Sequence, residues 1–373
     1  MEISKLLISG FRNLVSQELV PSSGVTLVVG RNGAGKSNLL EAVTVLGNLT
    51  SFRPGPPAGL LRWQGESYTI VATVKRDQTP VELRHEAQLG HHLRRALFRG
   101  ARRLTVGEYL QLCPVAALSG FDRALVTGAP EDRRRFLDRL AFHLHPEALR
   151  LLQQYRRALR QRAGLLAGGR PAVEVEAFEH VLATTGARLV ELRLAAMRQL
   201  TVALEIEMGL LHWSPGRPQM RYHAPDGLGS PDASSLAIRL QSALARSRRL
   251  DTQQRRASVG PHRHDLAITV GGVPAREALS AGQAKLLAVG LRLAALAVVE
   301  ERLGGAPVVV FDDVDAELDA GALERVLARL HGRAQVLVSS ARPELVLPFS
   351  TAATVWRMEE GRVLVGETER SVE

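Results

Sequence analysis

The chain contains very little cysteine and few aromatic residues. Its 373 residues include one cysteine, Cys113, and aromatic side chains make up only 4% of the total. A single cysteine excludes an intrachain disulfide and favours a reducing compartment. We expect Cys113 to be an inert strand residue before Pro114. The scarcity of aromatic residues argues against a platform that stacks nucleic-acid bases.

Long hydrophobic runs are also missing. No uninterrupted apolar segment approaches the roughly 18 residues that a membrane-spanning helix needs, and the N-terminal residues 1–5 do not resemble a signal peptide. Hydrophobic residues make up 45% of the chain and charged residues 23%, as in ordinary globular proteins. We therefore expect a cytoplasmic protein without a membrane segment, and the length favours two or three domains.

The charge is strongly basic. The chain has 48 lysine and arginine residues against 38 aspartate and glutamate residues, a net charge of +10 and a sequence pI of about 10.6. Almost all of the basic residues are arginines, a bias typical of a GC-rich genome, so a single arginine cluster is weak support for a binding site. The net excess still indicates an acidic partner such as nucleic acid or an anionic membrane surface.

The most specific motif is a phosphate-binding loop, or P-loop. It fits G-x-x-x-x-G-K-[ST] and lies between an apolar strand, 25–29, and a helical run, 38–46, rather than in a solvated glycine-rich turn. Its glycines let backbone N–H groups turn towards phosphates, and the helix N-terminus adds its positive dipole end. We expect Lys36 to reach the β- and γ-phosphates of ATP and Ser37 to bind Mg²⁺. The nucleotide-binding residues predicted here are Gly30, Arg31, Asn32, Gly33, Ala34, Gly35, Lys36, Ser37 and Asn38.

A second half of this site is predicted near the other end of the chain. Four apolar residues, 308–311, lead to Asp312 and Asp313. This pattern is typical of a buried parallel strand that delivers a carboxylate to the ligand-binding edge of an α/β sheet. We expect Asp312 to hold Mg²⁺ and Asp313 to orient or deprotonate the attacking water. Alone, the segment would be read as an acidic turn, but the P-loop favours an ATP site.

The segment 279–283, Leu-Ser-Ala-Gly-Gln, opens a helix that is expected to end near Leu303. Ser280 suits the N-cap, and the free N–H groups of a helix start also bind anions. Such a segment is usually only a cap, and its position one helix before Asp312 strengthens the functional interpretation. The segment 315–319 after the Asp312 strand resembles a capped helix start.

The order of elements predicts an α/β fold in which a nucleotide-binding head is assembled from both chain ends. Strand patterns occupy 3–9, 25–29, 68–75 and 81–88. Helical periodicity starts at Pro130 and continues to Leu211 with a break at 167–171, a Pro- and Gly-rich segment follows at 214–230, and 235–249 is again helical. From Val259 strands and helices alternate. The predicted division is 1–125 for the N-terminal part of the head, 126–255 for an inserted α-helical arm, and 256–373 for the C-terminal part of the head.

The order P-loop, L-S-x-G-Q, apolar strand with two aspartates, and E-L-D resembles that of the ABC-type ATPases. The resemblance implies that Ser280 and Gly282, with Gln283 beside them, bind the γ-phosphate of an ATP held by a second subunit. Two ATP molecules would then be sandwiched in a head-to-tail homodimer. Asp319 would belong to the loop that crosses this interface.

Within that class the chain resembles the RecF family of bacterial DNA-repair ATPases. The segment 10–14, Gly-Phe-Arg-Asn-Leu, is similar to a family motif in which Arg12 and Asn13 approach the nucleotide. Ala281 departs from the arginine that is frequent in the family, Ala316 departs from its serine, and 118–122 only loosely follows its F-x-P-E-D motif. Three further segments fit the family: 128–138 fits G-x-P-x-x-R-R-x-F-L-D, 155–162 fits Y-x-R-x-L-x-Q-R, and 260–266 fits G-P-H-R-x-D-L.

The resemblance implies a slow, DNA-stimulated ATPase of DNA repair, replication, recombination and the SOS response. Such a protein dimerises on ATP at gapped or junction DNA and works with RecR and RecO to load RecA onto single strands. Two arginine clusters could contact DNA phosphates, although a solvated face is an equally good interpretation of each. They are Arg94, Arg95, Arg99, Arg102 and Arg103 in an expected hairpin, and Arg246, Arg248, Arg249, Arg255 and Arg256.

Two other functions fit part of the sequence. An ATPase subunit of a transport complex, or of another DNA-maintenance complex, would share the P-loop. A transporter subunit should, however, carry a histidine after the strand 336–338, where this chain has Ser339 and Ser340, and a short helical insert. A non-enzymatic scaffold with a vestigial P-loop would not need the paired aspartates Asp312 and Asp313.

Overall fold

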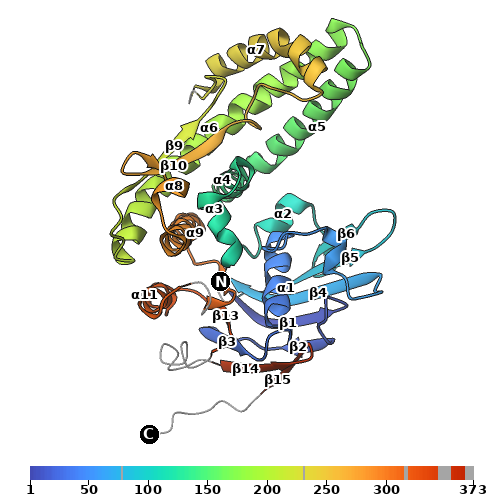
Figure 1. Cartoon of the computed structure of the whole chain (residues 1–373). Helices are drawn as coiled ribbons and strands as arrows, with labels where there is room; N and C mark the ends of the chain where they lie inside the picture. Colours follow the sequence, from blue (N-terminus) through green and yellow to red (C-terminus); the bar gives the residue numbers. More distant parts are fainter. Residues whose placement is uncertain (77–78, 230–231, 315–317, 343–353, 366–373) are drawn as a thin grey trace. The chain divides into compact units, whose positions relative to one another are not determined.

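The structure is a computed structural model, and it describes residues 1–76, 79–229, 232–314, 318–342 and 354–365. The chain divides into two compact units, whose elements are labelled in Figure 1. Both chain ends contribute to the first unit, as an inserted-domain arrangement requires. The first unit comprises Met1–Arg123, Glu207–His212 and Ala281–Glu373, and the second comprises Ala124–Ile206 and Trp213–Ser280.

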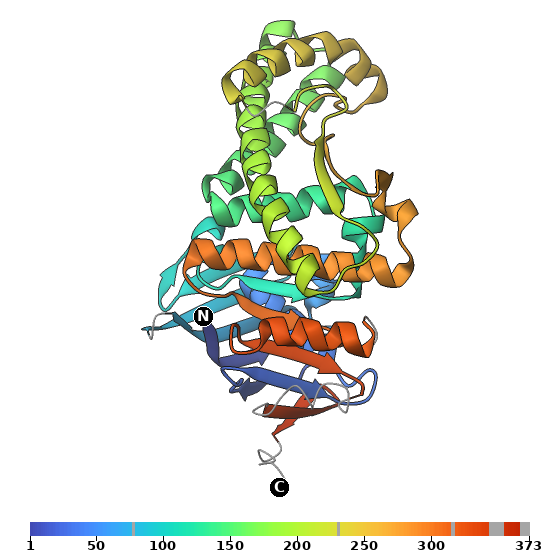
Figure 2. The ribbon, with the colours of Figure 1, turned by 90° about the vertical axis from the view of Figure 1, so that its left-hand side faces the viewer.

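One sheet of the first unit is built from strands at both ends of the chain. Five of its six strands run parallel, and the buried strand β12 has only apolar side chains, as expected where both faces are covered. Figure 2 shows strands in blue, orange and red side by side in this sheet. The order is β15 (Arg362–Val365), β14 (Thr354–Glu359), β3 (Val25–Val29), β13 (Val336–Ser340), β12 (Val308–Phe311) and β8 (Val115–Leu118).

A second sheet of the first unit is antiparallel. Its strands alternate between buried and exposed positions, so that one face supplies core side chains and the other faces solvent. The predicted hairpin that carries the first arginine cluster is confirmed, because β6 pairs with β7. The order is β2 (Gln17–Leu19), β1 (Glu2–Ser9), β4 (Ser67–Arg76), β5 (Thr79–Gln88), β6 (Arg94–Arg99) and β7 (Arg102–Arg103).

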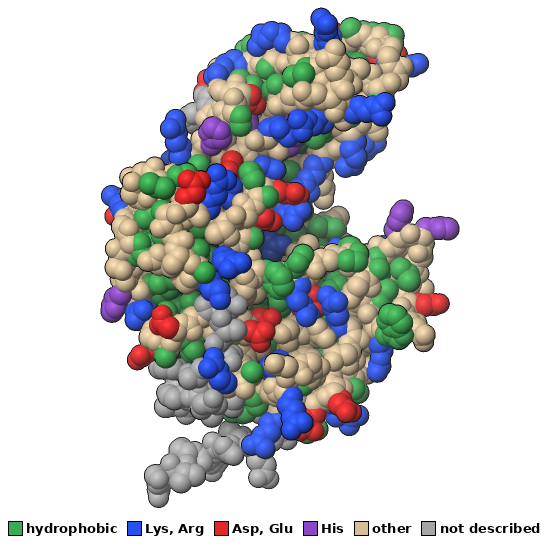
Figure 3. All heavy atoms as spheres, viewed as in Figure 1, with side chains coloured by type: hydrophobic (Ala, Val, Ile, Leu, Met, Phe, Trp, Pro, Cys, Tyr) green, Lys and Arg blue, Asp and Glu red, His purple; other side chains and the backbone are tan. Residues whose placement is uncertain are grey.

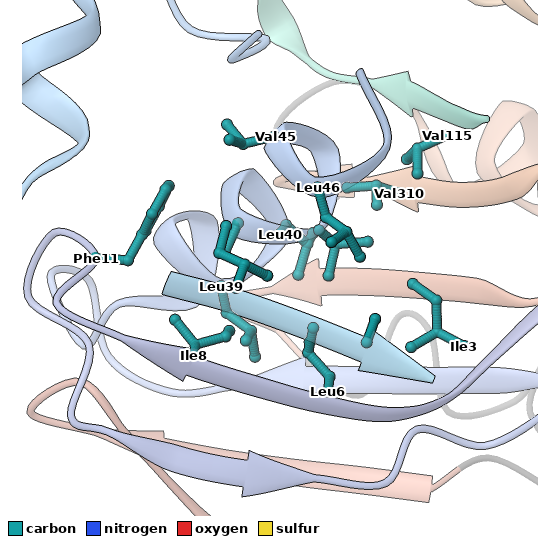
Figure 4. Close-up of a cluster of buried hydrophobic side chains, with 14 of the residues drawn as sticks. Ile3, Leu6, Ile8, Phe11, Leu39, Leu40, Val45, Leu46, Val115 and Val310 are labelled. Carbon is teal, nitrogen blue, oxygen red and sulfur yellow. The ribbon is translucent and has the colours of Figure 1, made fainter. Parts of the chain in front are cut away.

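Helix α1 (Lys36–Asn48), which follows the P-loop, lies between the two sheets. Leu39 and Leu40 have no exposed surface and belong to one core cluster with Ile3 of β1 and Val310 of β12 (Figure 4). Near its C-terminal end, a Cβ on Gly47 would lie 2.3 Å from the carbonyl oxygen of Cys113, so only glycine permits this close packing. Such burial fixes the P-loop against both sheets.

Several shorter helices and two long ones complete the first unit. Among the described residues, α9 alone is long and apolar enough to cross a membrane, yet 61% of its most apolar stretch is buried inside the protein, as in a core helix. The helices are η1 (Pro57–Leu60), α2 (Val106–Leu110), η2 (Gly120–Arg123), α9 (Ala281–Leu303), α11 (Ala320–Leu330) and the last residues of α6 (Ala172–Leu210).

The second unit is mainly helical. Pro130 occupies the first turn of α4 with acidic residues beside it, which suits the helix dipole. A buried ion-pair group joins three of its helices: Arg162 of α5 pairs with Glu179 of α6 and Asp251 of α7, and each side chain is about 1% exposed. The helices are α3 (Ala124–Thr127), α4 (Pro130–Leu144), α5 (Glu147–Ala167), α6, α7 (Ala233–Gln254) and α8 (Ala275–Ala278), and the strands are β9 (Pro218–His223), β10 (Asp265–Val270) and β11 (Val273–Pro274).

Some details differ from the sequence-based expectation. The segment 214–230, which we expected to be irregular, contains strand β9. Its side chains alternate between half-buried and exposed, but the nearby Pro and Gly residues obscure this strand pattern in the sequence. Because β10 pairs with β9, the second unit extends to Ser280 rather than ending at 255. Cys113 is not in a strand: it lies in a bend before β8, where burial raises the pKa of its thiol to about 12.

Candidate functional site

The P-loop connects β3 to α1 with the geometry that phosphate binding requires. Gly33 and Gly35 have φ angles of 83° and 109°, which favour glycine. Gly35 is the N-cap of α1 and supplies no side-chain cap, so the first backbone N–H groups of the helix are available to an anion. The Lys36 side chain is buried, and its Nζ donates to the carbonyl oxygens of Gly30 at 2.7 Å and Arg31 at 3.2 Å.

The outer side of the loop is tightly enclosed by neighbouring backbone. A Cβ on Gly30 would lie 2.4 Å from the carbonyl oxygen of Met358 in β14, and a Cβ on Gly35 would lie 3.1 Å from Asn13 Oδ1. Asn13 Nδ2 donates to the Gly33 carbonyl oxygen at 3.4 Å. The loop conformation is therefore held from both chain ends before any ligand binds.

Asp312 brings the second half of the site to the P-loop. It follows β12 directly, is 6% exposed and accepts a hydrogen bond from the Ser339 hydroxyl at 2.7 Å. Burial raises the pKa of its carboxyl and Asp313 raises it further, whereas Ser339 and the nearby Ser37 and Arg53 oppose the shift. Ser37 therefore lies close to Asp312, and the two sequence motifs meet at one edge of the parallel sheet.

Asp313 is exposed beside this buried carboxylate. Its φ of 49° is unusual for a residue other than glycine, and its backbone N–H donates to Ser339 Oγ at 2.8 Å. The Ser339 hydroxyl thus binds both acidic residues: it donates to the Asp312 carboxylate and accepts from the Asp313 backbone. Backbone strain of this kind is frequent at catalytic sites.

Arg12 and Asn38 join a polar network on the first turns of α1. Glu41 has no exposed side-chain surface and accepts two hydrogen bonds from Arg12, at 2.8 and 2.7 Å, and one from Ser51 at 2.5 Å. Arg53 also pairs with Glu41 and donates to Asn38. Burial raises the pKa of the Glu41 carboxyl, but its arginine and serine partners lower it more, so the net shift is downward.

The L-S-x-G-Q segment is largely exposed. Ser280 directly precedes α9, and Ser280, Ala281 and Gly282 are all exposed. A Cβ on Gly282 would meet nothing within 4 Å, so the space above this turn is open. Gln283 follows in the first turn and is half-buried. Asp319 is the N-cap of α11 and accepts from Ala322 N at 2.8 Å, whereas 315–317 lie outside the described residues.

Sequence reasoning did not assign several residues that organise this edge. Ser339 occupies the position where transporter ATPases carry histidine, and nothing in its own sequence context indicates a bond to Asp312. The sequence did contain an indication for Glu41, because this acidic residue interrupts an otherwise apolar face of the predicted helix. In the segment 118–122, Asp122 is buried and accepts two bonds from Arg292 of α9, at 2.9 and 2.7 Å.

Ser37 and Asp312 form a donor set that fits Mg²⁺. A hydroxyl and a single carboxylate are oxygen ligands of the kind this ion prefers, and substrate phosphates and water complete its shell. Within the described ranges no group of three or more His, Cys, Asp or Glu side chains could hold a metal. A P-loop magnesium site does not require such a group.

The parallel sheet, the P-loop after β3, the aspartates after β12 and the exposed L-S-x-G-Q turn define an ABC-type ATPase. The comparison with protein families agrees: the family described as RecF/RecN/SMC N terminal domain matches residues 2–363. The chain belongs to the RecF family. It is 32% identical to DNA replication and repair protein RecF of Myxococcus xanthus (strain DK1622), over 95% of each chain. It is 34% identical to the RecF of Stenotrophomonas maltophilia (strain R551-3), over 98% of this chain and 99% of the relative.

Solved structures agree with this assignment. The fold matches a structure described as the recombination mediator protein RecF-ATPrS in the RecFOR pathway, with a TM-score of 0.87, 26% identity and 97% of each chain covered. An Smc head bound to the C-winged helix domain of ScpA matches with a TM-score of 0.55 at 17% identity. The second likeness concerns the fold alone.

Asp312→Asn should stabilise the nucleotide-free protein. Because the pKa of Asp312 is raised from 3.8 in the folded state, its charged form costs stability once the pH exceeds that raised value, and the neutral amide removes this cost. We expect a gain on the order of 1 kcal/mol at pH 7, seen as a higher midpoint in scanning calorimetry. The further rise caused by Mg-ATP in the native protein should be lost. A lower midpoint in the variant would contradict the cost assigned to the buried charge.

Proposed function

We propose that the chain is an ATP-dependent DNA-binding protein of recombinational DNA repair, which forms a head-to-tail homodimer around two ATP molecules. The observation that carries the proposal is the division of the site. The P-loop and the nearby Asp312 form one half-site, while Ser280 and Gly282 lie on an exposed, open turn. A second copy of the chain would bring such a turn to the γ-phosphate.

In this proposal the half-site binds and positions the phosphates. The backbone N–H groups of α1 and the P-loop bind the phosphates, with Lys36 released from its carbonyl partners towards the β- and γ-phosphates. Ser37 and Asp312 would hold Mg²⁺, which when bound would supply positive charge at the phosphates. Asp313 orients the attacking water. Arg12, Asn13 and Asn38 contact the rest of the nucleotide, and Ser280, Gly282, Gln283 and Asp319 act across the dimer interface.

Basic surface supports DNA as the partner. In the hairpin β6 to β7, Arg94, Arg99 and Arg103 are exposed, whereas Arg95 binds the Leu49 carbonyl oxygen and Arg102 pairs with Glu108. Figure 3 shows basic side chains spread over the region of α5 and α7. Around the end of α7, Arg248 pairs with glutamates, and the exposed members of the cluster are Arg246, Arg249, Arg255 and Arg256.

The relatives suggest the cellular setting. Similar proteins are named for DNA replication and repair, and solved neighbours belong to the RecFOR pathway. By this analogy the chain acts in the cytoplasm with RecR and RecO to load RecA, with slow, DNA-stimulated ATP turnover at gapped or junction DNA. We assign ATP chemistry to the first compact unit and part of the DNA contact to the second. Ser339, bound to Asp312 where a transporter has histidine, favours this function over transport.

Ser280→Arg should prevent ATP-dependent dimerisation while leaving ATP binding intact. The added side chain would block the open turn that meets the second subunit's γ-phosphate. Light scattering after size exclusion, with and without ATP and gapped DNA, should show a dimer for the native protein and a monomer for the variant. Lys36→Met should lose both properties, and Ser242→Arg, at an exposed serine of α7, should keep both. Normal dimerisation of Ser280→Arg would refute the sandwich.

Asp313→Asn should slow ATP hydrolysis by at least about 100-fold and prolong the ATP-bound dimer, since general-base catalysis supplies about 10² to 10⁴-fold. Nucleotide affinity should change little, because within the described residues the P-loop is held by bonds of Asn13 and Lys36 and not by the Asp313 side chain. Phosphate release and dimer lifetime are measured on the same sample. Unchanged turnover would place the water-positioning group on another residue.

DNA affinity should fall steeply as salt rises, because several phosphate contacts release counterions together. Replacing both Arg246 and Arg249 with alanine should lower the slope of log affinity against log salt by about 2, at about 0.9 per lost contact. The control Arg170→Ala removes an arginine that pairs with Glu174 and should preserve the slope. Fluorescence anisotropy with duplex DNA measures both slopes, and an affinity insensitive to salt would exclude phosphate contacts as its source.

A further inference from the structure

Three family-like segments have no place in the ATP site. They are 128–138, 155–162 and 260–266, and all lie in the second unit. The structure brings them together around the start of β10. Arg133 makes two hydrogen bonds to Asp265, both 2.9 Å long, and Arg134 donates to the His264 carbonyl oxygen at 2.8 Å. Tyr155 OH lies 2.7 Å from His262 Nδ1.

A continuous chain of polar side chains crosses this region. Asp138 of α4 pairs with Arg193 of α6 at 2.7 Å, and Arg193 lies 3.3 Å from the hydroxyl of Tyr222 in β9. The same hydroxyl is 3.0 Å from His264 Nδ1, and His264 Nε2 is 3.0 Å from Asp226. We call these five residues, Asp138, Arg193, Tyr222, His264 and Asp226, the β10 network. Arg193 also donates to the Pro261 carbonyl oxygen at 2.7 Å, which joins α6 directly to the third segment.

Arg193 and His264 of the β10 network are buried, and the other three residues are half-buried, so loss of a bond at the buried pair is costly. His264 is 0% exposed and Arg193 is 3% exposed. Burial alone would lower the pKa of Arg193, but Asp138 and Tyr222 raise it on balance, so the guanidinium remains charged and paired. Removing one member of a buried charged group leaves its partner without compensation. The network therefore holds α4, α6, β9 and the start of β10 in one arrangement.

The polypeptide leads from this network directly to the L-S-x-G-Q turn. Strand β10 continues through Gly271 and Gly272 into β11 and α8, and α8 packs against both β10 and α3. Ala275, the first residue of α8, is buried, and its carbonyl oxygen accepts from Leu279 N at 3.2 Å. Ser280 is the next residue and the last of the second unit, whereas Gly282 belongs to the first.

We propose that the β10 network positions Ser280 for the ATP of the second subunit, and so couples the arm to ATP-dependent dimerisation. The proposal rests on the dimer described under the proposed function. Tyr222 and His264 act as positioning residues: they fix β10, β10 carries α8, and α8 ends two residues before Ser280. DNA bound to the arginines of α7 would act on the same unit that carries Ser280.

The test compares a variant that lacks the Tyr222 hydroxyl with a control variant that lacks a buried tyrosine hydroxyl in the first unit. Tyr222→Phe deletes the bridge between Arg193 and His264 and keeps the ring. Tyr109→Phe deletes another buried hydroxyl, which has no hydrogen-bond partner within the described residues and lies in the first unit. For both variants, the dimer dissociation constant with a slowly hydrolysed ATP analogue, the ATP affinity of the monomer and hydrogen exchange of residues 275–283 are measured.

Tyr222→Phe should raise the dimer dissociation constant about tenfold, the size expected when one hydrogen bond to a charged group is lost. Exchange at 275–283 should increase, and the monomer's ATP affinity should stay within about twofold because the P-loop is untouched. Tyr109→Phe should match the native protein in all three measurements. A merely structural role for Tyr222 would lower the unfolding midpoint without changing the dimer constant, and that result would overturn the proposal. If the native protein did not dimerise on the analogue, the proposed dimer and this coupling would both fall.

Discussion

The close approach of Ser37 to the buried carboxyl of Asp312 is the constraint on which the nucleotide site depends. It brings the residue after Lys36 next to an acidic residue that follows β12, and this carboxyl is buried where water cannot replace a lost partner. The burial of α1 between two sheets and the packing of the P-loop against Asn13 and Met358 keep these groups in contact. Ser339 completes the arrangement by binding both aspartates of the second half.

The same edge of the sheet has the features of a site for charged groups that come from a ligand, not from the chain itself. Lys36 is held by backbone carbonyl oxygens, α1 begins without a side-chain cap, and the Asp312 carboxyl has a raised pKa because it is buried. Each of these features is unfavourable or neutral for the protein alone and becomes favourable when phosphates and a divalent cation bind. Part of the binding free energy for phosphates and the cation therefore comes from charged and polar groups that the protein alone does not pair fully.

Most of the head could be predicted from the sequence because its signals are local. The apolar strands 25–29 and 308–311, the glycines of the P-loop and Pro130 at a helix start each specify their own conformation, and the structure confirms these elements. The strand β9 was missed because Pro and Gly surround it and its partner β10 lies more than 40 residues later. Ser339, Arg53 and Tyr222 owe their roles to contacts across the fold, which no local pattern encodes.

Strand β3 lies between β13 and β14, so both of its edges are paired with strands from beyond residue 335. During synthesis the P-loop leaves the ribosome well before β13 and β14, so its supporting strand has no neighbours until those two strands have been made. Long-range parallel pairing of this kind forms slowly. A chain released before residue 335 would carry a P-loop motif on a strand with two open edges, so competence to bind ATP requires that translation has passed β13 and β14.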